Sequence, residues 1–357
     1  MTTLLPFPRL RSSASAHAEP AERDQLVLAD AYGRVATDLR VSLTDRCNLR
    51  CAYCMPPEGL DWLPGAEVLT DDEIVRLITI GVERLGITTV RLTGGEPLLR
   101  KNLELLVADI AALSPALDIA LTTNGIGLAA RAEKLAAAGL RRINISLDTL
   151  DPDTFVQLAR RRRLPDVLAG IAAARDAGLN PVKINTVLLR GVNDHEAFDL
   201  LRWAMAEQVQ LRFIEQMPLV PQHGWKRDEM ITADEIRERL GQYVELVEDR
   251  EDALTRGSAP AELFRVAGSG YSVGIIASVS KPFCGACDRV RLTADGQIRN
   301  CLFARTESDL RTPLRSGASD SHIATLWVAA VASKQPGHGI NDPSFLQPDR
   351  PMSAIGG

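Results

Sequence analysis

The hydrophobic pattern between residues 38 and 217 switches repeatedly between two periods. Alternating apolar and polar residues predict β-strands over DLRVSL, TTVRLTGG, DIALTTNG, RRINISLD, VKINTVLL and QLRFIEQM. Apolar residues every three or four positions predict helices over TDDEIVRLITIGVERLG, LELLVADIAALS, ARAEKLAAAGL, PDVLAGIAAARDAGL and HEAFDLLRWAMAEQV. Repeated strand–helix alternation is typical of an α/β fold with a parallel sheet and helices outside. Six strands are too few to close an eight-stranded barrel, so we expect an open, incomplete one.

The first of these helices carries its own boundary signals. Thr70 and Glu73 stand in capping-box positions, and Gly86 ends the pattern. A later arginine run, residues 160–163, is interpreted as the solvated end of a helix.

The strand RRINISLD is polar on one face. Its apolar residues, at 143, 145 and 147, point one way, and Asn144, Ser146 and Asp148 point the other. Since a sheet covered by helices on both faces should be apolar on both, the polar face indicates a lumen that holds a polar ligand. The alternative is a strand end exposed to solvent.

The pattern changes after Met217. A helix over TADEIRERLGQY leads into strand-and-turn sequence in which ADGQ is a hairpin signal, and a last helix over SHIATLWVAAVASK precedes a loop-like tail. We therefore expect three parts: a flexible extension over residues 1–35, a partial barrel over 36–220 and a C-terminal region over 221–357.

Composition excludes several classes of protein. The chain has 357 residues, 45% hydrophobic and 24% charged, with a net charge of -5. This predicts a globular protein without the basic field that attracts nucleic acid or membranes. No apolar run reaches the ~18 residues of a membrane span. The first eighteen residues hold two arginines and no acid, so they are either a short transit peptide or a disordered tail. We favour the tail and expect a cytoplasmic protein.

The cysteines fall into two sets of three. Cys47, Cys51 and Cys54 form C-x3-C-x2-C, and a second set, C-x2-C-x13-C, consists of Cys284, Cys287 and Cys301. Odd sets make a poor disulfide framework, so metal binding is the better interpretation. A four-iron cubane normally takes four thiolates, so three would leave one iron open to a small molecule. A zinc ion would need a fourth ligand from elsewhere, and this alternative remains open for both sets.

The first set and its surroundings resemble the radical S-adenosylmethionine (SAM) enzymes. The resemblance rests on the C-x3-C-x2-C spacing, on Tyr53 just before the last cysteine, and on TGGEP at residues 93–97. It implies a partial triosephosphate isomerase barrel and a [4Fe-4S] cluster whose open iron chelates SAM. One electron would then cleave SAM to a 5'-deoxyadenosyl radical. Independently, the two glycines permit a close backbone approach, and Glu96 could neutralise an ammonium group.

From about residue 36 to the terminal Gly-Gly, the chain resembles the GTP 3',8-cyclase family of molybdenum cofactor biosynthesis. The resemblance implies a lyase that forms 3',8-cyclo-7,8-dihydro-GTP by abstracting the ribose C3' hydrogen. It also implies a second [4Fe-4S] cluster, held by the second cysteine set, whose open iron binds guanine.

The resemblance assigns individual roles. The expected SAM-site residues are Tyr53, Gly94, Gly95, Glu96, Ser146 and Met217. The expected GTP-binding residues are Arg40, Arg91, Thr122, Lys183, Arg289 and Arg291. The expected catalytic residues are Cys47, Cys51, Cys54, Arg289, Gly356 and Gly357. Elementary chemistry agrees in part: Arg289 and Arg291 share one face of an extended strand and could clamp an anion, and no Walker-type phosphate loop is present.

Two other functions remain open at this stage. A peptide-modifying radical SAM enzyme could carry an auxiliary cluster, and a zinc-binding module would have no catalysis. The resemblance to the GTP 3',8-cyclase family implies GTP as substrate, a flavodoxin or ferredoxin-type electron donor, a downstream pyranopterin-forming enzyme and a possible homodimer.

Overall fold

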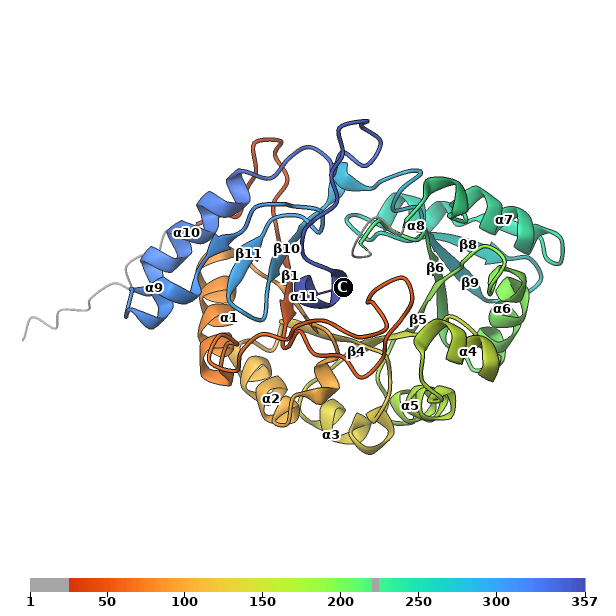
Figure 1. The fold of residues 1–357 in the computed structure, drawn as a ribbon, viewed down its shortest axis with the longest axis horizontal. Coiled ribbons are helices and arrows are strands. Elements are labelled where there is room, and N and C mark those ends of the chain that lie inside the picture. The colour runs from red at the N-terminus through yellow and green to blue at the C-terminus, as the bar shows by residue number, and fades with distance from the viewer. Residues whose placement is uncertain (1–25, 220–224, 357) are drawn as a thin grey trace, which may run out of the picture.

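The computed structural model describes residues 26–219 and 225–356, and a single twelve-stranded sheet runs through them. Six strands of the first half pair in parallel and in chain order: β1 (Asp38–Ser42), β2 (Thr89–Thr93), β3 (Asp118–Thr123), β4 (Arg142–Ser146), β5 (Val182–Val187) and β6 (Gln210–Ile214). They curve into a ring that does not close (Figure 1). The prediction of an open, six-stranded parallel barrel in this segment is confirmed.

Strands from the second half extend the sheet at both edges. At one edge β9 (Ser272–Ile276) pairs in parallel with β6, followed by the antiparallel strands β8 (Glu262–Val266) and β7 (Leu246–Glu248). At the other edge β10 (Arg289–Leu292) pairs in parallel with β1, followed by β11 (Gln297–Arg299) and β12 (Ser308–Asp309). The ADGQ signal does form the turn between β10 and β11. The strand-and-turn sequence after Met217 is thus continuous with the barrel sheet.

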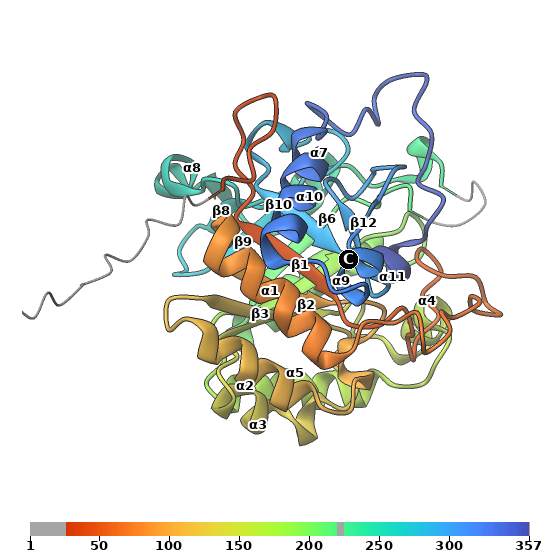
Figure 2. The ribbon, with the colours of Figure 1, turned by 90° about the vertical axis from the view of Figure 1, so that its left-hand side faces the viewer.

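Helices cover the outside of the ring, apart from the C-terminal α11, which lies inside it (Figures 1 and 2). They are α1 (Asp71–Leu85), α2 (Leu103–Leu113), α3 (Ala132–Ala137), α4 (Pro152–Ala159), α5 (Leu164–Asp176), α6 (Ala197–Ala206), α7 (Ala233–Gly241), α8 (Arg250–Thr255), α9 (Arg311–Arg315), α10 (Asp320–Ala332) and α11 (Met352–Ile355). Their apolar stripes and the apolar strand residues form one large buried core. Trp327 of α10 is fully buried in it. No helix in the described part of the chain is long and apolar enough to cross a membrane.

The signals at the ends of α1 act as the sequence predicted. Thr70 and Glu73 form a reciprocal capping box, and Gly86 adopts the left-handed conformation at the other end. Such an N-cap stabilises a helix by about 1 kcal/mol. Helix α4, in contrast, was not predicted, because eight residues hold too few turns for a clear period. Its start signal was nevertheless present: the Asp151 side chain accepts hydrogen bonds from the first turn, and Pro152 follows it.

Part of the predicted extension is folded. Residues 1–25 lie outside the described residues, whereas residues 26–35 form a turn that packs on the sheet. Leu28 is fully buried there, and the Asp30 carboxylate accepts backbone hydrogen bonds from Tyr32 and Arg34. The isolated bridge between Ala29 and Val35 closes this turn.

Candidate active site

A cavity of about 540 Å³ lies inside the open ring, within the range of small-molecule sites. It is lined by both cysteine sets and by all the expected SAM-site and GTP-binding residues; the full set is Arg40, Cys47, Cys51, Tyr53, Cys54, Arg91, Gly94, Gly95, Glu96, Thr122, Ser146, Lys183, Met217, Cys284, Cys287, Arg289, Arg291 and Cys301. Residues as far apart in the chain as Asp38 and Ser353 therefore share one chamber.

The first cysteine set lies on the loop that follows β1, and α4 braces this loop. The backbone N–H groups of Arg50 and Ala52 donate to carbonyls at the end of α4. Arg160, just after α4, donates through Nη1 to the carbonyls of Arg50 and Met55, at 3.0 and 3.1 Å. The interpretation of residues 160–163 as a solvated helix end is therefore wrong for Arg160, because its guanidinium reaches carbonyls that a cysteine loop leaves unpaired. Residues 161–163 are exposed as expected.

The TGGEP turn packs directly on the cysteine loop. A Cβ on Gly95 would lie 2.2 Å from the Arg46 carbonyl oxygen, and one on Gly94 would lie 2.4 Å from the Thr44 oxygen. In the same place the Gly95 N–H donates to the Thr44 carbonyl and the Glu96 N–H donates to that of Arg46. The close backbone approach expected of these glycines is thus, first of all, an approach to the cysteine loop.

Glu96 is buried and already engaged. Its carboxylate accepts hydrogen bonds from the Thr123 hydroxyl at 2.6 Å and from the backbone N–H groups of Leu98 and Asn124. Burial raises its pKa to about 7 against the opposing effect of these donors. These contacts tie the end of β3 to the TGGEP turn, so neutralisation of an ammonium group by Glu96 stays a prediction.

Tyr53 and the polar face of β4 meet across the cavity. The Tyr53 hydroxyl donates to Asp148 at 2.6 Å, and Asp148 also accepts from the Val187 N–H. Burial raises the pKa of Asp148 to about 6. Ser146 and Asn144 line the same cavity, so the polar face predicted for this strand does point into a lumen.

The register of the sheet gathers the expected cations. Arg40 on β1 lies directly between Arg91 on β2 and Arg291 on β10. Further along the sheet, Asn144 on β4 lies between Thr122 on β3 and Lys183 on β5. Residues paired in register share a face of the sheet, which is why these side chains project into one chamber.

These cations are crowded and only partly satisfied. Among the described residues that line the cavity, four arginines have buried nitrogens without a hydrogen-bond partner: Nε of Arg40, Nε and Nη1 of Arg91, Nε of Arg212 and Nε of Arg289. Burial and mutual repulsion lower the pKa of Arg40, Arg91 and Arg212. The same causes lower the pKa of Lys183 to about 8. Because unpaired buried donors are costly, the residues present fit a polyanion in this chamber.

Two further arginines, which were not predicted from the sequence, line the cavity: Arg212 on β6 and Arg142 on β4. Arg212 donates to the Asn144 side chain at 3.0 Å. Its signal was available, because it alternates with Leu211 and Phe213, which are fully buried in the core. Arg142 differs from Arg212 in that it forms an ion pair with Asp118.

In the second cysteine set, Cys284 and Cys287 precede β10, and Cys301 follows β11. Arg289 donates to the Ser258 carbonyl at 2.7 Å and lies over the Phe283 ring. All six cysteines are free thiols, and none of the described residues form a group of three or more His, Cys, Asp or Glu suited to a single metal ion. Cysteine thiolates are the ligands that iron–sulfur clusters take, so the donor type of both sets fits such a group.

Helix α11 lies inside the ring (Figure 1). Gly356, which follows it, lies beside Ser42 of β1 and Thr93 of β2, and its carbonyl accepts a hydrogen bond from Arg291. A Cβ on Gly356 would lie 2.4 Å from the Ser42 hydroxyl. The tail expected to be loop-like thus ends in a short helix. Gly357 lies outside the described residues.

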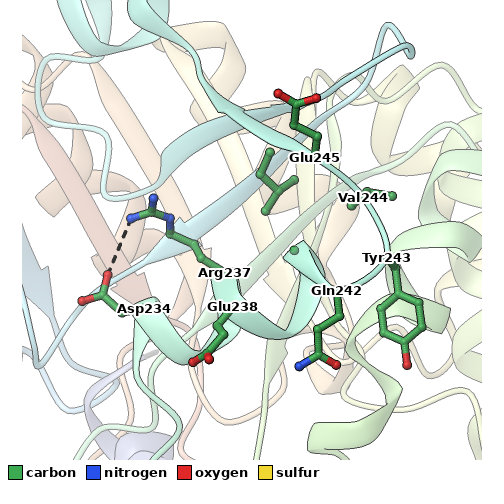
Figure 3. A pocket seen from close by; sticks show the side chains of 9 residues that line it. Asp234, Arg237, Glu238, Gln242, Tyr243, Val244 and Glu245 are labelled. Atoms are coloured by element: carbon green, nitrogen blue, oxygen red, sulfur yellow. Dashed lines mark ion pairs between the residues drawn. The ribbon is translucent and has the colours of Figure 1, made fainter.

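A second hollow, at the C-terminal end of α7, has a different character. Figure 3 shows an open groove lined by charged and polar side chains, including the Arg237–Asp234 pair and Tyr243. The Tyr243 ring stacks on the Phe198 ring, with 4.5 Å between the ring centroids. No expected site residue lies here.

Comparison with known proteins agrees with this geometry. The family model described as the radical SAM superfamily matches residues 41–204, and the one described as Molybdenum Cofactor Synthesis C matches residues 209–340. Streptococcus suis SuiB bound to precursor peptide SuiA is similar in fold, with a TM-score of 0.57, 15% identity, and 84% of this chain and 67% of that chain covered. Native anSMEcpe with bound AdoMet is also similar in fold, with a TM-score of 0.57, 14% identity, and 85% of this chain and 82% of that chain covered. The chain is a radical SAM enzyme.

Curated relatives narrow the class. The GTP 3',8-cyclase of Streptomyces coelicolor is 62% identical, with 93% of this chain and 96% of the relative covered. The GTP 3',8-cyclase of Mycolicibacterium smegmatis is 59% identical, with 98% of this chain and 97% of the relative covered. The GTP 3',8-cyclase of Corynebacterium glutamicum is 56% identical, with 96% of this chain and 92% of the relative covered. The chain belongs to the GTP 3',8-cyclase family. The resemblance stated from the sequence is confirmed.

Proposed function

We propose that this protein converts GTP to 3',8-cyclo-7,8-dihydro-GTP, the first step of molybdenum cofactor biosynthesis. The observation that carries the proposal is the single chamber with one cysteine set at each side and a row of unsatisfied buried cations between them. Family membership agrees with it. Neither a zinc-binding module nor a peptide-modifying enzyme has a use for such a row.

The first cysteine set would hold a [4Fe-4S] cluster, which, with SAM, supplies the radical that abstracts hydrogen. This chain orients the set through Arg160 and the glycines of the TGGEP turn, as described above. Tyr53, Ser146, Met217 and the turn Gly94–Glu96 would contact SAM, since they line the cavity beside these cysteines.

The cation row would hold the triphosphate. Arg40, Arg91, Thr122 and Lys183 project from β1, β2, β3 and β5 of the same sheet, and Arg212 on β6 adds a charge that was not predicted from the sequence. Guanidinium groups suit this task because they form paired, charge-assisted hydrogen bonds with phosphate oxygens. A bound triphosphate would also supply partners for the orphaned nitrogens.

The second cysteine set, Cys284, Cys287 and Cys301, would hold a second [4Fe-4S] cluster next to the guanine. Arg289 and Arg291 would face the substrate between the two sets. The Gly356 carbonyl reaches Arg291, so we assign the Gly-Gly tail a part in shaping the substrate pocket.

The remaining assignments concern the protein's surroundings. We propose a cytoplasmic, homodimeric enzyme that takes electrons from a flavodoxin or ferredoxin-type donor. Its product would pass to a pyranopterin-forming enzyme.

The test is anaerobic turnover. Protein reconstituted with iron and sulfide is incubated with SAM, dithionite and GTP, and both 5'-deoxyadenosine and the cyclised nucleotide are quantified. We expect both products to depend on GTP, and Cys51→Ser to form neither. Formation of 5'-deoxyadenosine that is indifferent to GTP but responds to a peptide would contradict the proposal and favour the peptide-modifying alternative.

A further inference from the structure

Lys334, which follows α10, is a buried lysine with an unusual set of partners. Only 4% of its surface is exposed. Its ammonium group donates to the carbonyls of Cys287 and Arg289, at 3.0 and 2.9 Å, and lies 3.5 Å from the Cys287 sulfur. Within the described residues it has no carboxylate partner. The proposed function gives this lysine no role.

The charge of Lys334 needs an explanation, because burying an unpaired ammonium group costs several kcal/mol. An ammonium group has three donors, and here three acceptors face it: two carbonyls and one sulfur. Only the sulfur can carry a full negative charge. The arrangement is therefore complete when Cys287 is a thiolate, the form in which cysteine binds a metal.

A second sulfur of the set receives a donor from the same segment. The backbone N–H of His338 donates a hydrogen bond to the Cys284 sulfur, as the Lys334 ammonium group does to the Cys287 sulfur. The segment 334–338 thus directs donors at two of the three sulfurs of the second set.

A residue from the other end of the chain holds this segment in place. Arg34 donates to the carbonyls of Gln335 and Pro336, at 2.5 and 3.0 Å, and also to the Cys284 carbonyl at 2.8 Å. Its Nε donates to Asp30, which fixes the guanidinium. The turn over residues 26–35 therefore connects the loop that carries Cys284 to the segment 334–338.

We propose that Lys334 is a positioning residue that holds Cys287 as a ligand and tunes the reduction potential of the cluster bound there, with Arg34 fixing the segment that carries it. The inference rests on the second cluster of the proposed function. Hydrogen bonds and positive charge at cluster sulfurs stabilise the reduced, more negative state. Losing the ammonium group should therefore make the second cluster harder to reduce.

The experiment isolates the second cluster in the full-length chain. Cys47, Cys51 and Cys54 are all changed to Ser, and the protein is reconstituted anaerobically with iron and sulfide. Iron content should be about four per chain. The midpoint potential is then measured by a redox titration followed by electron paramagnetic resonance.

In that background we expect Lys334→Met to shift the midpoint to a more negative value and to release iron faster to a chelator. Lys334→Arg, which keeps the charge and the donors, should stay closer to the parent and guards against a simple folding defect. Lys281→Met is the matched control, because Lys281 is exposed and pairs with Asp234. Arg34→Met should accelerate iron release with a smaller shift in potential, since Arg34 does not contact a sulfur.

Two failures can be told apart. If the triple-serine background binds no iron, the second cluster of the proposed function falls, and this inference falls with it. If the background binds iron but Lys334→Met leaves both the midpoint and the iron-release rate of the parent unchanged, only the inference is overturned.

Discussion

At the scale of single residues, the most informative side chain is one that was not predicted from the sequence. Arg212 is buried in the chamber with an orphaned Nε. A charge-assisted contact to a phosphate stabilises binding by about 1.5–3 kcal/mol. We therefore expect Arg212→Leu to raise the Kd for GTP roughly tenfold to a hundredfold, as measured by anaerobic titration calorimetry. Arg202→Leu is the control, because Arg202 is exposed on α6; an equal loss in both variants would contradict the role.

Lys183 makes GTP binding sensitive to pH. Burial and the neighbouring arginines lower its pKa to about 8, so the unliganded enzyme loses this cation as the pH rises through 8. Phosphate groups are already fully ionised there, since their second pKa is about 6. We expect the Kd for GTP to rise between pH 7.5 and about 9.5, and the rise to be smaller in Lys183→Arg, whose charge persists. A pH profile identical in the two proteins would exclude Lys183 as the cause.

At the scale of elements, α4 and the residue that follows it stabilise the first cysteine loop. Arg160 bonds two carbonyls of that loop. We expect Arg160→Met to release iron from the first set on the order of tenfold faster, measured with a chelator, because residues that support metal ligands have effects of this size. Arg162→Met is the matched control, since the Arg162 side chain is 79% exposed. Equal release rates would show that the loop holds its shape alone.

The C-terminal element offers a pair of glycines for comparison. Gly356 and Gly339 both have positive φ, 77° and 70°, but a Cβ would meet Ser42 only at Gly356, whereas nothing lies within 4 Å at Gly339. Alanine therefore strains the backbone at both positions and crowds the chamber at one. We expect Gly356→Ala to form much less cyclised nucleotide while still cleaving SAM, and Gly339→Ala to retain product formation. Similar product yields in the two variants would exclude a role for the fit of the tail.

At the scale of the whole molecule, the strand–helix alternation was sufficient to predict the barrel, because each unit has a local signal. The two cysteine sets were equally visible, since their spacing is a property of the chain alone. What could not be predicted were pairings between distant segments. Nothing local indicates that β10 joins β1, or that Lys334 and Arg34 meet at the second cysteine loop. Arg212 is an intermediate case. The alternation of β6 indicates that its side chain lies on the face opposite the core, but not which residues surround it there.

The sheet order has a consequence for dividing this protein. A fragment ending near residue 218 would strip the partners from β1 and β6 at once, leaving two rows of unpaired amide and carbonyl groups. We expect residues 26–218, produced alone, to self-associate during size-exclusion chromatography while the intact chain elutes as a discrete species. The later half of the polypeptide would then protect both edges of the sheet formed by the earlier half, in addition to holding substrate. Gene fusions or splits are therefore better made outside residues 26–356.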